Sequence, residues 1–270
     1  MKSILVYADH GPATESRLQA GLDLARARNG HLTVIQVTPL ASLITIDPMG
    51  ASYVPGGAIE QIRADQAALH DRLRERLEQE DVSWNIIGYD GDPTEAVLSA
   101  SRLADVIIVS LGSGGRKDRP HPLLDIGELA IHAGCPVLAI PAEASGFNVG
   151  GTAMIAWDGS AESAHALRAA APLLTMADNV HVVTIEEKPS AFPSTEAGEY
   201  LSRHGVNCEL VSRGRGVATI EEELDAVATE LGAELLVMGA YGHSRLRETL
   251  LGGVTRYFTE DSTIPLLLAH

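Results

Sequence analysis

The sequence repeats itself, and this repeat restricts the fold more than any other feature of the chain. A short apolar run leads into Asp158 as another apolar run leads into Asp9, 149 positions earlier. Near the end of each copy, Pro265 matches Pro136 at a shorter spacing of 129 positions. Self-similarity at a fixed spacing is typical of duplicated domains. The sequence therefore predicts two copies of one fold, and the first copy is longer in its middle part.

Short apolar runs alternate with amphipathic segments in both copies. The runs that we interpret as strands are 4–8, 31–37, 83–89, 105–110 and 136–140 in the first copy, and 154–157, 179–185, 207–213, 235–238 and 266–268 in the second. Parallel strands need crossover connections, and the amphipathic segments supply helices for them. The predicted fold class is α/β, with two tandem open, mostly parallel five-stranded sheets and helices on both faces.

Two segments without clear periodicity mark the organisation of the chain. Prolines and glycines interrupt residues 38–57 of the first copy, so we expect an irregular loop or flap there. A long amphipathic helix is expected at 58–80, with an apolar stripe of Ile59, Ile62, Leu69, Leu73 and Leu77. The small and polar segment 141–150 precedes the second copy. It is the predicted linker between domains at 1–143 and 150–270.

Charge and composition narrow the class of protein. The chain has 20 basic and 36 acidic residues and a formal net charge of −16, which disfavours nucleic acid and anionic membranes as partners. No apolar run reaches the roughly 18 residues of a membrane helix, and the first strand begins where a signal peptide would lie. We therefore expect a cytoplasmic protein. Cys135 and Cys208 lack metal-ligand spacing, so we expect buried structural thiols.

A glycine-rich segment follows the fourth strand of the second copy. The apolar run Leu235–Met238 ends in Gly239 and Gly242, and a second pair, Gly252 and Gly253, comes just before a predicted helix. Glycine leaves backbone N–H groups uncovered, and a helix N-terminus carries partial positive charge, so the segment suits phosphate groups. The alternative is a tight connection between a strand and a helix, with no ligand.

Three features together resemble the universal stress protein family. They are the segment AWDGSAESAHAL at 156–167, the pattern G-x2-G-x9-G, and a closing strand preceded by Pro265. Two copies in one chain are similar to the tandem type of this family. The resemblance implies a Rossmann-like fold of the adenine-nucleotide alpha-hydrolase type, with ATP across the carboxyl ends of strands one and four. The general rule for open α/β sheets predicts the same location.

The resemblance also implies a role for each matching residue of the second copy. Asp158 would face the adenine and the ribose, and Ile185 would line the adenine pocket. Gly239 and Gly242 would let the phosphates approach the backbone. The implied ligand is ATP, with or without Mg²⁺, and ADP and AMP are alternatives. The N–H groups that meet the phosphates would come from Gly252, Gly253, Val254 and Thr255, whose hydroxyl would lie beside them.

The second copy departs from the family pattern at Gly253, where a serine or threonine is usual. The lost hydroxyl would weaken phosphate binding by roughly 1.5 to 3 kcal/mol, the scale of a hydrogen bond to a charged group. Thr255 is a candidate for compensation. Arg245, Arg247 and Arg256 are candidates for added positive charge, although exposed arginines on a helix are more often simply solvated.

The first copy has lost most of the pattern. At the spacing of 129, the four motif glycines correspond to Ser110, Ser113, Leu123 and Leu124, and Asp9 alone remains. Leucines in place of bare backbone would block phosphates, so we expect this copy to bind no nucleotide in the manner of the family. The basic residues Arg116, Lys117 and Arg119 of the same loop are best explained as solvated charges.

The sequence contains no catalytic constellation. Ser113, Gly114, Gly115 and Asp118 superficially resemble the pyrophosphatase loop of ATP-dependent synthetases, but that loop follows the first strand and this one follows the fourth. No serine or cysteine nucleophile and no metal-ligand spacing accompanies the candidate histidines His10, His165 and His243. We predict no catalytic residues, no metal site and, at most, slow ATP hydrolysis.

Two functions remain open. The first is a regulatory or stress-response protein that holds an adenine nucleotide in its second domain. The second is a nucleotide-free interaction scaffold of the same fold, which would meet an unknown protein partner through the apolar flap at 40–57. The resemblance further implies that the closing strands, Val137–Ile140 and Leu266–Leu268, pair within one chain as a pseudo-dimer. A homodimer of such chains is an additional expectation.

Overall fold

The computed structural model describes residues 1–39, 56–112, 124–186, 192–214, 216–240 and 253–270, and the backbone alone of 45–46 and 52–53. The first half of the chain contains β1 (Ser3–Ala8), α1 (Thr14–Arg28), β2 (His31–Thr38), β3 (Thr45–Ile46), β4 (Ser52–Tyr53), α2 (Ala58–Leu77), β5 (Ser83–Asp90), α3 (Pro93–Ala100), β6 (Val106–Ser110), α4 (Ile126–His132) and β7 (Val137–Ile140). The second half contains β8 (Ala153–Ala156), α5 (Ala161–Leu174), β9 (Val180–Glu186), α6 (Ser194–Arg203), β10 (Glu209–Gly214), α7 (Ile220–Leu231), β11 (Leu235–Gly239), α8 (Gly253–Asp261) and β12 (Leu266–Ala269).

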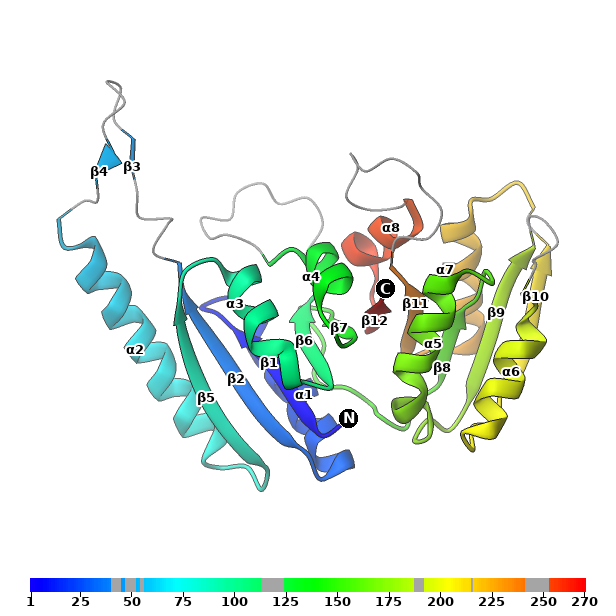
Figure 1. Ribbon diagram of the computed structural model, residues 1–270, viewed down its shortest axis with the longest axis horizontal. Coiled ribbons are helices and arrows are strands. Elements are labelled where there is room, and N and C mark those ends of the chain that lie inside the picture. The colour runs from blue at the N-terminus through cyan, green and yellow to red at the C-terminus, as the bar shows by residue number, and fades with distance from the viewer. Residues whose placement is uncertain are drawn as a thin grey trace.

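Five strands from each half form one continuous sheet. Among the described residues its order is β10-β9-β8-β11-β12-β7-β6-β1-β2-β5, and the two halves lie side by side along it (Figure 1). Neighbouring strands within each half are parallel, as in the pairing of β1 with β2 and of β11 with β8. The predicted fold class, with two open five-stranded parallel sheets, is therefore confirmed.

The two halves are joined through their closing strands. β7 and β12 are antiparallel neighbours, and Leu138 of β7 lies opposite Leu267 of β12. Both side chains are fully buried. Each strand covers the apolar edge of the other, which would otherwise expose unpaired backbone groups. The predicted pairing of the closing strands within one chain is confirmed.

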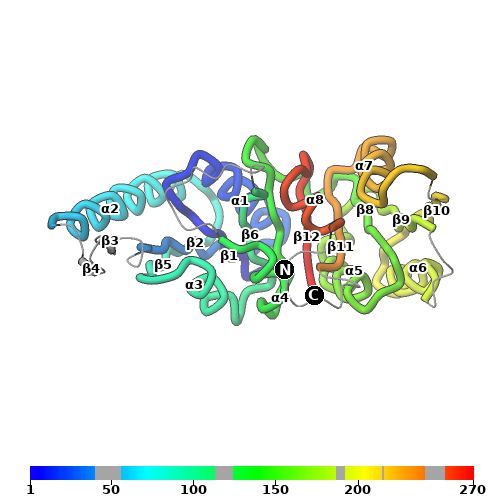
Figure 2. Tube along the Cα trace, turned by 90° about the horizontal axis from the view of Figure 1, so that it is seen from above, coloured from blue at the N-terminus to red at the C-terminus, as the bar shows by residue number. Residues whose placement is uncertain are grey.

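Helices cover both faces of the sheet (Figure 2). One buried cluster contains side chains of α1, α2, α5 and α6, and a second contains side chains of α3, α4, α7 and α8. Capping signals in the sequence explain several helix starts. Asp92 accepts a hydrogen bond from the N–H of Glu95, and Thr219 and Glu222 form a reciprocal capping box at α7.

The middle part of the first half differs from expectation. Of the predicted apolar stripe on α2, the part from Leu69 onward is buried, whereas Ile59 is 39% exposed. In Figure 1 the start of α2 stands at the outer edge of the molecule, next to β3 and β4. These two strands form an antiparallel pair, so the expected irregular flap contains a short β-ladder. The rest of that flap, residues 40–44, 47–51 and 54–55, lies outside the described residues.

Two smaller predictions were also wrong in detail. The helix expected from Leu123 begins at Ile126, because Asp125 caps it through the N–H of Glu128. The two cysteines are partly exposed rather than buried, and both are free thiols. Burial nevertheless raises the pKa of Cys135 to about 12, so this thiol stays protonated at neutral pH.

In the part of the chain that the structure describes, no helix is both long and apolar enough to cross a membrane.

The shared sheet predicts that the two halves unfold together. Each half contains one tryptophan, Trp84 in β5 and Trp157 just after β8, so the variants Trp84→Phe and Trp157→Phe leave a single reporter in one half. We expect the same denaturant midpoint from both variants, because opening either half exposes the β7–β12 seam. Fluorescence-monitored urea unfolding measures this. Two midpoints, each following one reporter, would show that the halves unfold independently.

Candidate functional site

The described residues of the predicted site gather at the carboxyl ends of the strands in the second half. Asp158 follows β8, Ile185 lies near the end of β9, and Gly239 is the last residue of β11. Helix α8 begins at Gly253, where the chain returns from the loop after β11. This edge is where open parallel sheets bind ligands. The predicted residues Gly242 and Gly252 lie outside the described residues.

Asp158 has a structural task whether or not a ligand is present. Its carboxylate accepts a hydrogen bond of 2.9 Å from the N–H of Ser160, and Ser160 in turn caps α5 by accepting from the N–H of Ser163. Asp9 in the first half accepts in the same way from the N–H of Gly11, at 2.8 Å. The aspartate common to both halves therefore shapes the turn into the following helix.

Gly239 allows a helix to lie directly on the end of β11. A Cβ atom at this position would stand 2.6 Å from the carbonyl carbon of Glu162 and 2.7 Å from the backbone nitrogen of Ser163. Both atoms belong to the first turn of α5, and neither can move aside without moving the helix. The structure therefore supplies a packing reason for this glycine, and its predicted contact with phosphate remains a prediction.

The start of α8 has the features of an anion-binding helix terminus. Gly253 is exposed and has no side chain, and Val254 is partly buried. The first N–H groups of a helix have no partner within the helix and carry partial positive charge. Thr255 is only 4% exposed, on the buried face of α8 with Phe258 and Thr259. Gly253 is thus the open position, and Thr255 lies on the buried face of α8.

In the first half a buried arginine lies beside Asp9, the counterpart of Asp158. The guanidinium of Arg17 forms an ion pair of 2.9 Å with Asp9 and donates hydrogen bonds of 2.8 Å to Ser110 and 2.6 Å to Thr14. It also lies 5.4 Å from the centre of the Tyr7 ring. The Arg17 side chain is 5% exposed. The network ties β1, α1 and the end of β6 together at the carboxyl edge of the sheet.

This network sets the electrostatics of Asp9. Burial by itself would raise the pKa of this carboxyl, but the Arg17 charge and hydrogen bonds from Arg17, Gly11 and Thr14 outweigh it and hold the pKa below its usual value. Asp9 is therefore ionised at neutral pH, and Arg17 neutralises its charge inside the chain.

The second half has alanine or glycine at the positions equivalent to three residues of this network. The equivalents of Tyr7, Arg17 and Ser110 at the spacings of the repeat are Ala156, Ala166 and Gly239. Ala166 of α5 is fully buried, so the second half has no large side chain at the position of Arg17. Asp158 is exposed, and the position equivalent to Arg17 carries no charge. Sequence reasoning missed Arg17, although the aligned pair of Arg17 and Ala166 was a readable signal.

The structure gives little support to the residues that were predicted as candidates for added positive charge or for catalysis at this edge. Arg256 is exposed and pairs with Glu260 at 2.9 Å. His165 is exposed on α5, and no group of metal-ligating side chains occurs among the described residues. His243, Arg245, Arg247 and the basic residues of the first-half loop, Arg116, Lys117 and Arg119, lie outside the described residues. So do Ser113, Gly114, Gly115 and Asp118.

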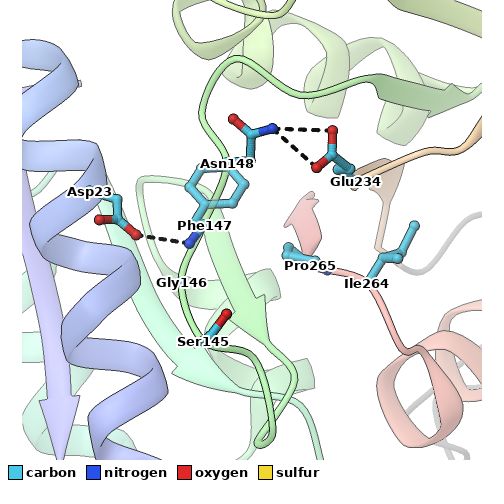
Figure 3. A pocket seen from close by; sticks show the side chains of 8 residues that line it. All are labelled: Asp23, Ser145, Gly146, Phe147, Asn148, Glu234, Ile264 and Pro265. Carbon is cyan, nitrogen blue, oxygen red and sulfur yellow. Dashed lines mark hydrogen bonds between the residues drawn. The ribbon is translucent and has the colours of Figure 1, made fainter.

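A separate cavity of about 560 Å³ lies where the linker between the halves crosses them (Figure 3). Asp23 of α1 accepts the N–H of Phe147 at 2.9 Å, and Glu234 accepts the side-chain amide of Asn148 at 3.1 Å. The two carboxylates thus fasten the linker to both halves. Since Glu234 precedes β11, this cavity is at the amino ends of the strands, away from the predicted site.

The Arg17 network predicts a specific pH dependence. A carboxyl whose pKa is lowered by folding stabilises the protein above its ordinary pKa, near 4, and this stabilisation is lost as pH falls through the folded-state pKa. The variant Arg17→Met removes the charge and keeps a side chain of similar size. We therefore expect the pKa of Asp9 to rise, and the loss of stability that this carboxyl causes at low pH to disappear.

An NMR titration of the Asp9 carboxyl, with unfolding free energies measured between pH 5 and 2, tests this expectation. Arg256→Met, an exposed arginine of the second half, is the control. An unchanged Asp9 pKa in Arg17→Met would contradict the assignment of Arg17 as the neutralising charge.

Comparison with known proteins matches the architecture. The model of the universal stress protein family matches residues 1–141 and again 151–270. The universal stress protein Slr1230 of Synechocystis is 30% identical over 119 residues, which are 42% of this chain and 40% of that protein. The chain therefore aligns with less than half the length of that relative. YxiE of Bacillus subtilis, also a universal stress protein, is 23% identical over 51% of this chain and 97% of its own.

A crystal structure agrees at the level of the fold. A universal stress protein from Archaeoglobus fulgidus superposes with a TM-score of 0.76 and 18% identity, over 99% of this chain and 96% of that one. The two family-model matches together cover nearly the whole sequence and coincide with the two halves of the sheet. The chain belongs to the universal stress protein family, as a member with two family domains in tandem.

Proposed function

We propose that this chain is a regulatory, stress-response protein that binds one adenine nucleotide, ATP, ADP or AMP, in its second domain, residues 150–270. One observation carries the proposal. At equivalent places, the first half has the buried, charged Arg17 and the partly buried Leu124, whereas the second half has Ala166 and an exposed glycine, Gly253, at the start of α8, and its Asp158 is exposed. Family membership and the position at the carboxyl ends of the strands support it.

Each residue of the site has a proposed part in binding. Asp158 accepts hydrogen bonds from the ribose or adenine, and Ile185 packs against the base from the end of β9. The N–H groups of Gly253, Val254 and Thr255 point toward the phosphates, since they belong to the first turn of α8. Gly242 and Gly252 complete the backbone cradle. Thr255 contributes its N–H group, and its side chain belongs to the buried face of α8.

The proposal extends to the setting in which the protein works. We place the protein in the cytoplasm and propose that two chains, each of them an intrachain pseudo-dimer, form a homodimer. A separate protein partner would receive the signal. The proposed role is binding with, at most, slow hydrolysis. If no nucleotide binds, the alternative function is a nucleotide-free interaction scaffold of the same fold.

The two aspartates of the repeat provide a matched test. Asn keeps the side-chain oxygen that receives the N–H of Ser160 or Gly11 but removes the charge. We expect Asp158→Asn to weaken nucleotide binding about tenfold, since a hydrogen bond to a charged group is lost. Asp9→Asn, the same change in the closed half, should leave affinity unaltered. Calorimetric titration measures both, and equal losses in the two variants would contradict the assignment to the second domain.

The departure from the family pattern predicts a gain of function. Gly253 has no positive φ, and the nearest atom to an added Cβ is the Glu221 carboxylate at 3.4 Å, an ordinary contact distance. Gly253→Ser should therefore be tolerated, and its hydroxyl should tighten nucleotide binding about tenfold. Leu124→Ser makes the matching change in the first half and should create no second site. A Gly253→Ser variant that folds normally with unchanged affinity would show that phosphates do not reach α8.

A further inference from the structure

The two outer strands of the sheet differ in how well they are protected against pairing with another chain. β5 ends the sheet on one side and β10 ends it on the other, so each has one edge that pairs with no other described strand. β10 has six residues, and Glu209 and Arg213 are charged. β5 has eight residues, and its only charged one is Asp90, at its last position. Proteins commonly blunt an exposed edge by shortness and charge, so β5 is the less protected strand.

The elements next to β5 lie on the faces of the sheet or beyond the end of the strand. Figure 2 shows α2 on one face beside β5 and α3 on the other face, and their side chains belong to two different buried clusters. In Figure 1, β3 and β4 stand beyond the carboxyl end of β5. Every second residue of a strand directs its N–H and C=O groups to the same side, so β5 presents a row of these groups to another strand.

Gly88 leaves open space on the face of β5 that carries α2. Successive side chains of a strand point to opposite faces, so Gly88 shares a face with Trp84 and Ile86. Both of these side chains are partly buried and pack against the cluster that contains side chains of α2. A Cβ atom added at Gly88, by contrast, would have no described atom within 4 Å. This face of β5 is therefore filled around Trp84 and Ile86 and open around Gly88.

We propose that β5 pairs antiparallel with β5 of a second copy of this chain, about a two-fold axis at Ile86. Such an axis stands perpendicular to the sheet and keeps α2 on the same face in both chains. Trp84 of each chain then lies opposite Gly88 of the other, where its ring fills the open space. Asp90 lies opposite Val82, so the charged residue of the strand meets no like charge.

The chain already contains one pairing of this form. β7 and β12 are antiparallel, and Leu138 lies opposite Leu267, its own equivalent at the spacing of 129. The proposed axis would likewise set Ile86 opposite its own equivalent. Because β5 and β7 are at opposite edges of the first half, the new pairing leaves the β7–β12 seam unchanged. The inference rests on the homodimer of the proposed function and specifies its interface, and it does not depend on nucleotide binding.

The variant Gly88→Lys tests the interface without disturbing the single chain. Gly88 has no positive φ and has open space at its Cβ position, so a lysine fits there in the isolated chain. In the dimer the lysine would occupy the place of Trp84 from the second copy. Gly214→Lys is the matched control, because Gly214 ends β10, has no positive φ and has no described atom within 4 Å of an added Cβ.

Sedimentation equilibrium of the full chain over a range of concentrations measures the dissociation constant of the dimer. We expect Gly88→Lys to raise this constant about a hundredfold, because two-fold symmetry places the substitution at both ends of the pairing. Gly214→Lys should leave the constant unchanged, and circular dichroism verifies that both variants fold.

The fluorescence of Trp84 tests the register of the two strands. In Trp157→Phe it is the remaining tryptophan. Its emission should shift to shorter wavelength as the chain dimerises, because the ring becomes buried against the second copy. The shift should be absent from the double variant Trp157→Phe/Gly88→Lys at the same concentrations.

The outcomes separate the homodimer from its interface. A dimer that Gly88→Lys does not weaken, or that Gly214→Lys weakens equally, would overturn the pairing through β5 and leave the homodimer standing. Equal Trp84 emission from monomer and dimer would overturn the register about Ile86. A wild-type chain that stays monomeric up to its solubility limit would overturn the homodimer and this inference together, and the proposed nucleotide binding would stand.

Discussion

The antiparallel pairing of β7 with β12 is the contact on which the whole architecture depends. It converts two open five-stranded sheets into one sheet whose middle is the seam between the halves. The facing side chains are fully buried leucines, valine and alanine, and each large one contributes on the order of 1.5 to 3 kcal/mol when buried. Because the seam uses the closing strand of each half, both carboxyl edges where a ligand would bind remain outside it. Residues at one carboxyl edge can therefore differ from those at the other without disturbing the seam.

The two halves carry different residues at these carboxyl edges. In the first half, Arg17 supplies a cation from within the chain, and its two terminal nitrogens bond to Asp9, Thr14 and Ser110. A buried charge is tolerated only with such partners, although the buried Nε of Arg17 has no hydrogen-bond partner among the described residues. In the second half, Gly239 lets the first turn of α5 lie on the end of β11, and Asp158 and Gly253 are exposed.

Most of the fold follows from local patterns in the sequence. Apolar runs mark the ten strands of the sheet, and caps such as Asp92 and Thr219 mark helix starts, because both signals act over a few residues. The start of α2 could not be placed from its apolar stripe: periodicity shows which residues share a face, but not whether the sheet extends far enough to cover Ile59. The short pair β3 and β4 was missed for a similar reason, since two-residue strands carry no period.

The candidate site was only partly predictable. The sequence identified Asp158 and Gly239 by resemblance, yet the structure assigns both a local task, in a turn and in a close helix contact. Their presence in the sequence is therefore weaker evidence for a ligand than the motif suggests. Arg17 acts through contacts between separate elements, which no local pattern reveals. Only the repeat exposes such residues, because it sets Arg17 against Ala166 and Leu124 against Gly253.

A crystal structure of the full chain grown with saturating ADP and Mg²⁺ would show which half binds the nucleotide. We predict electron density for one nucleotide per chain, with its base and ribose near Ile185 and Asp158 and its phosphates at the N–H groups of α8. We also predict an undisturbed Arg17 network in the first half. A nucleotide beside Asp9 with Arg17 displaced, or a nucleotide bound at the linker cavity instead, would show that the proposed site is wrong.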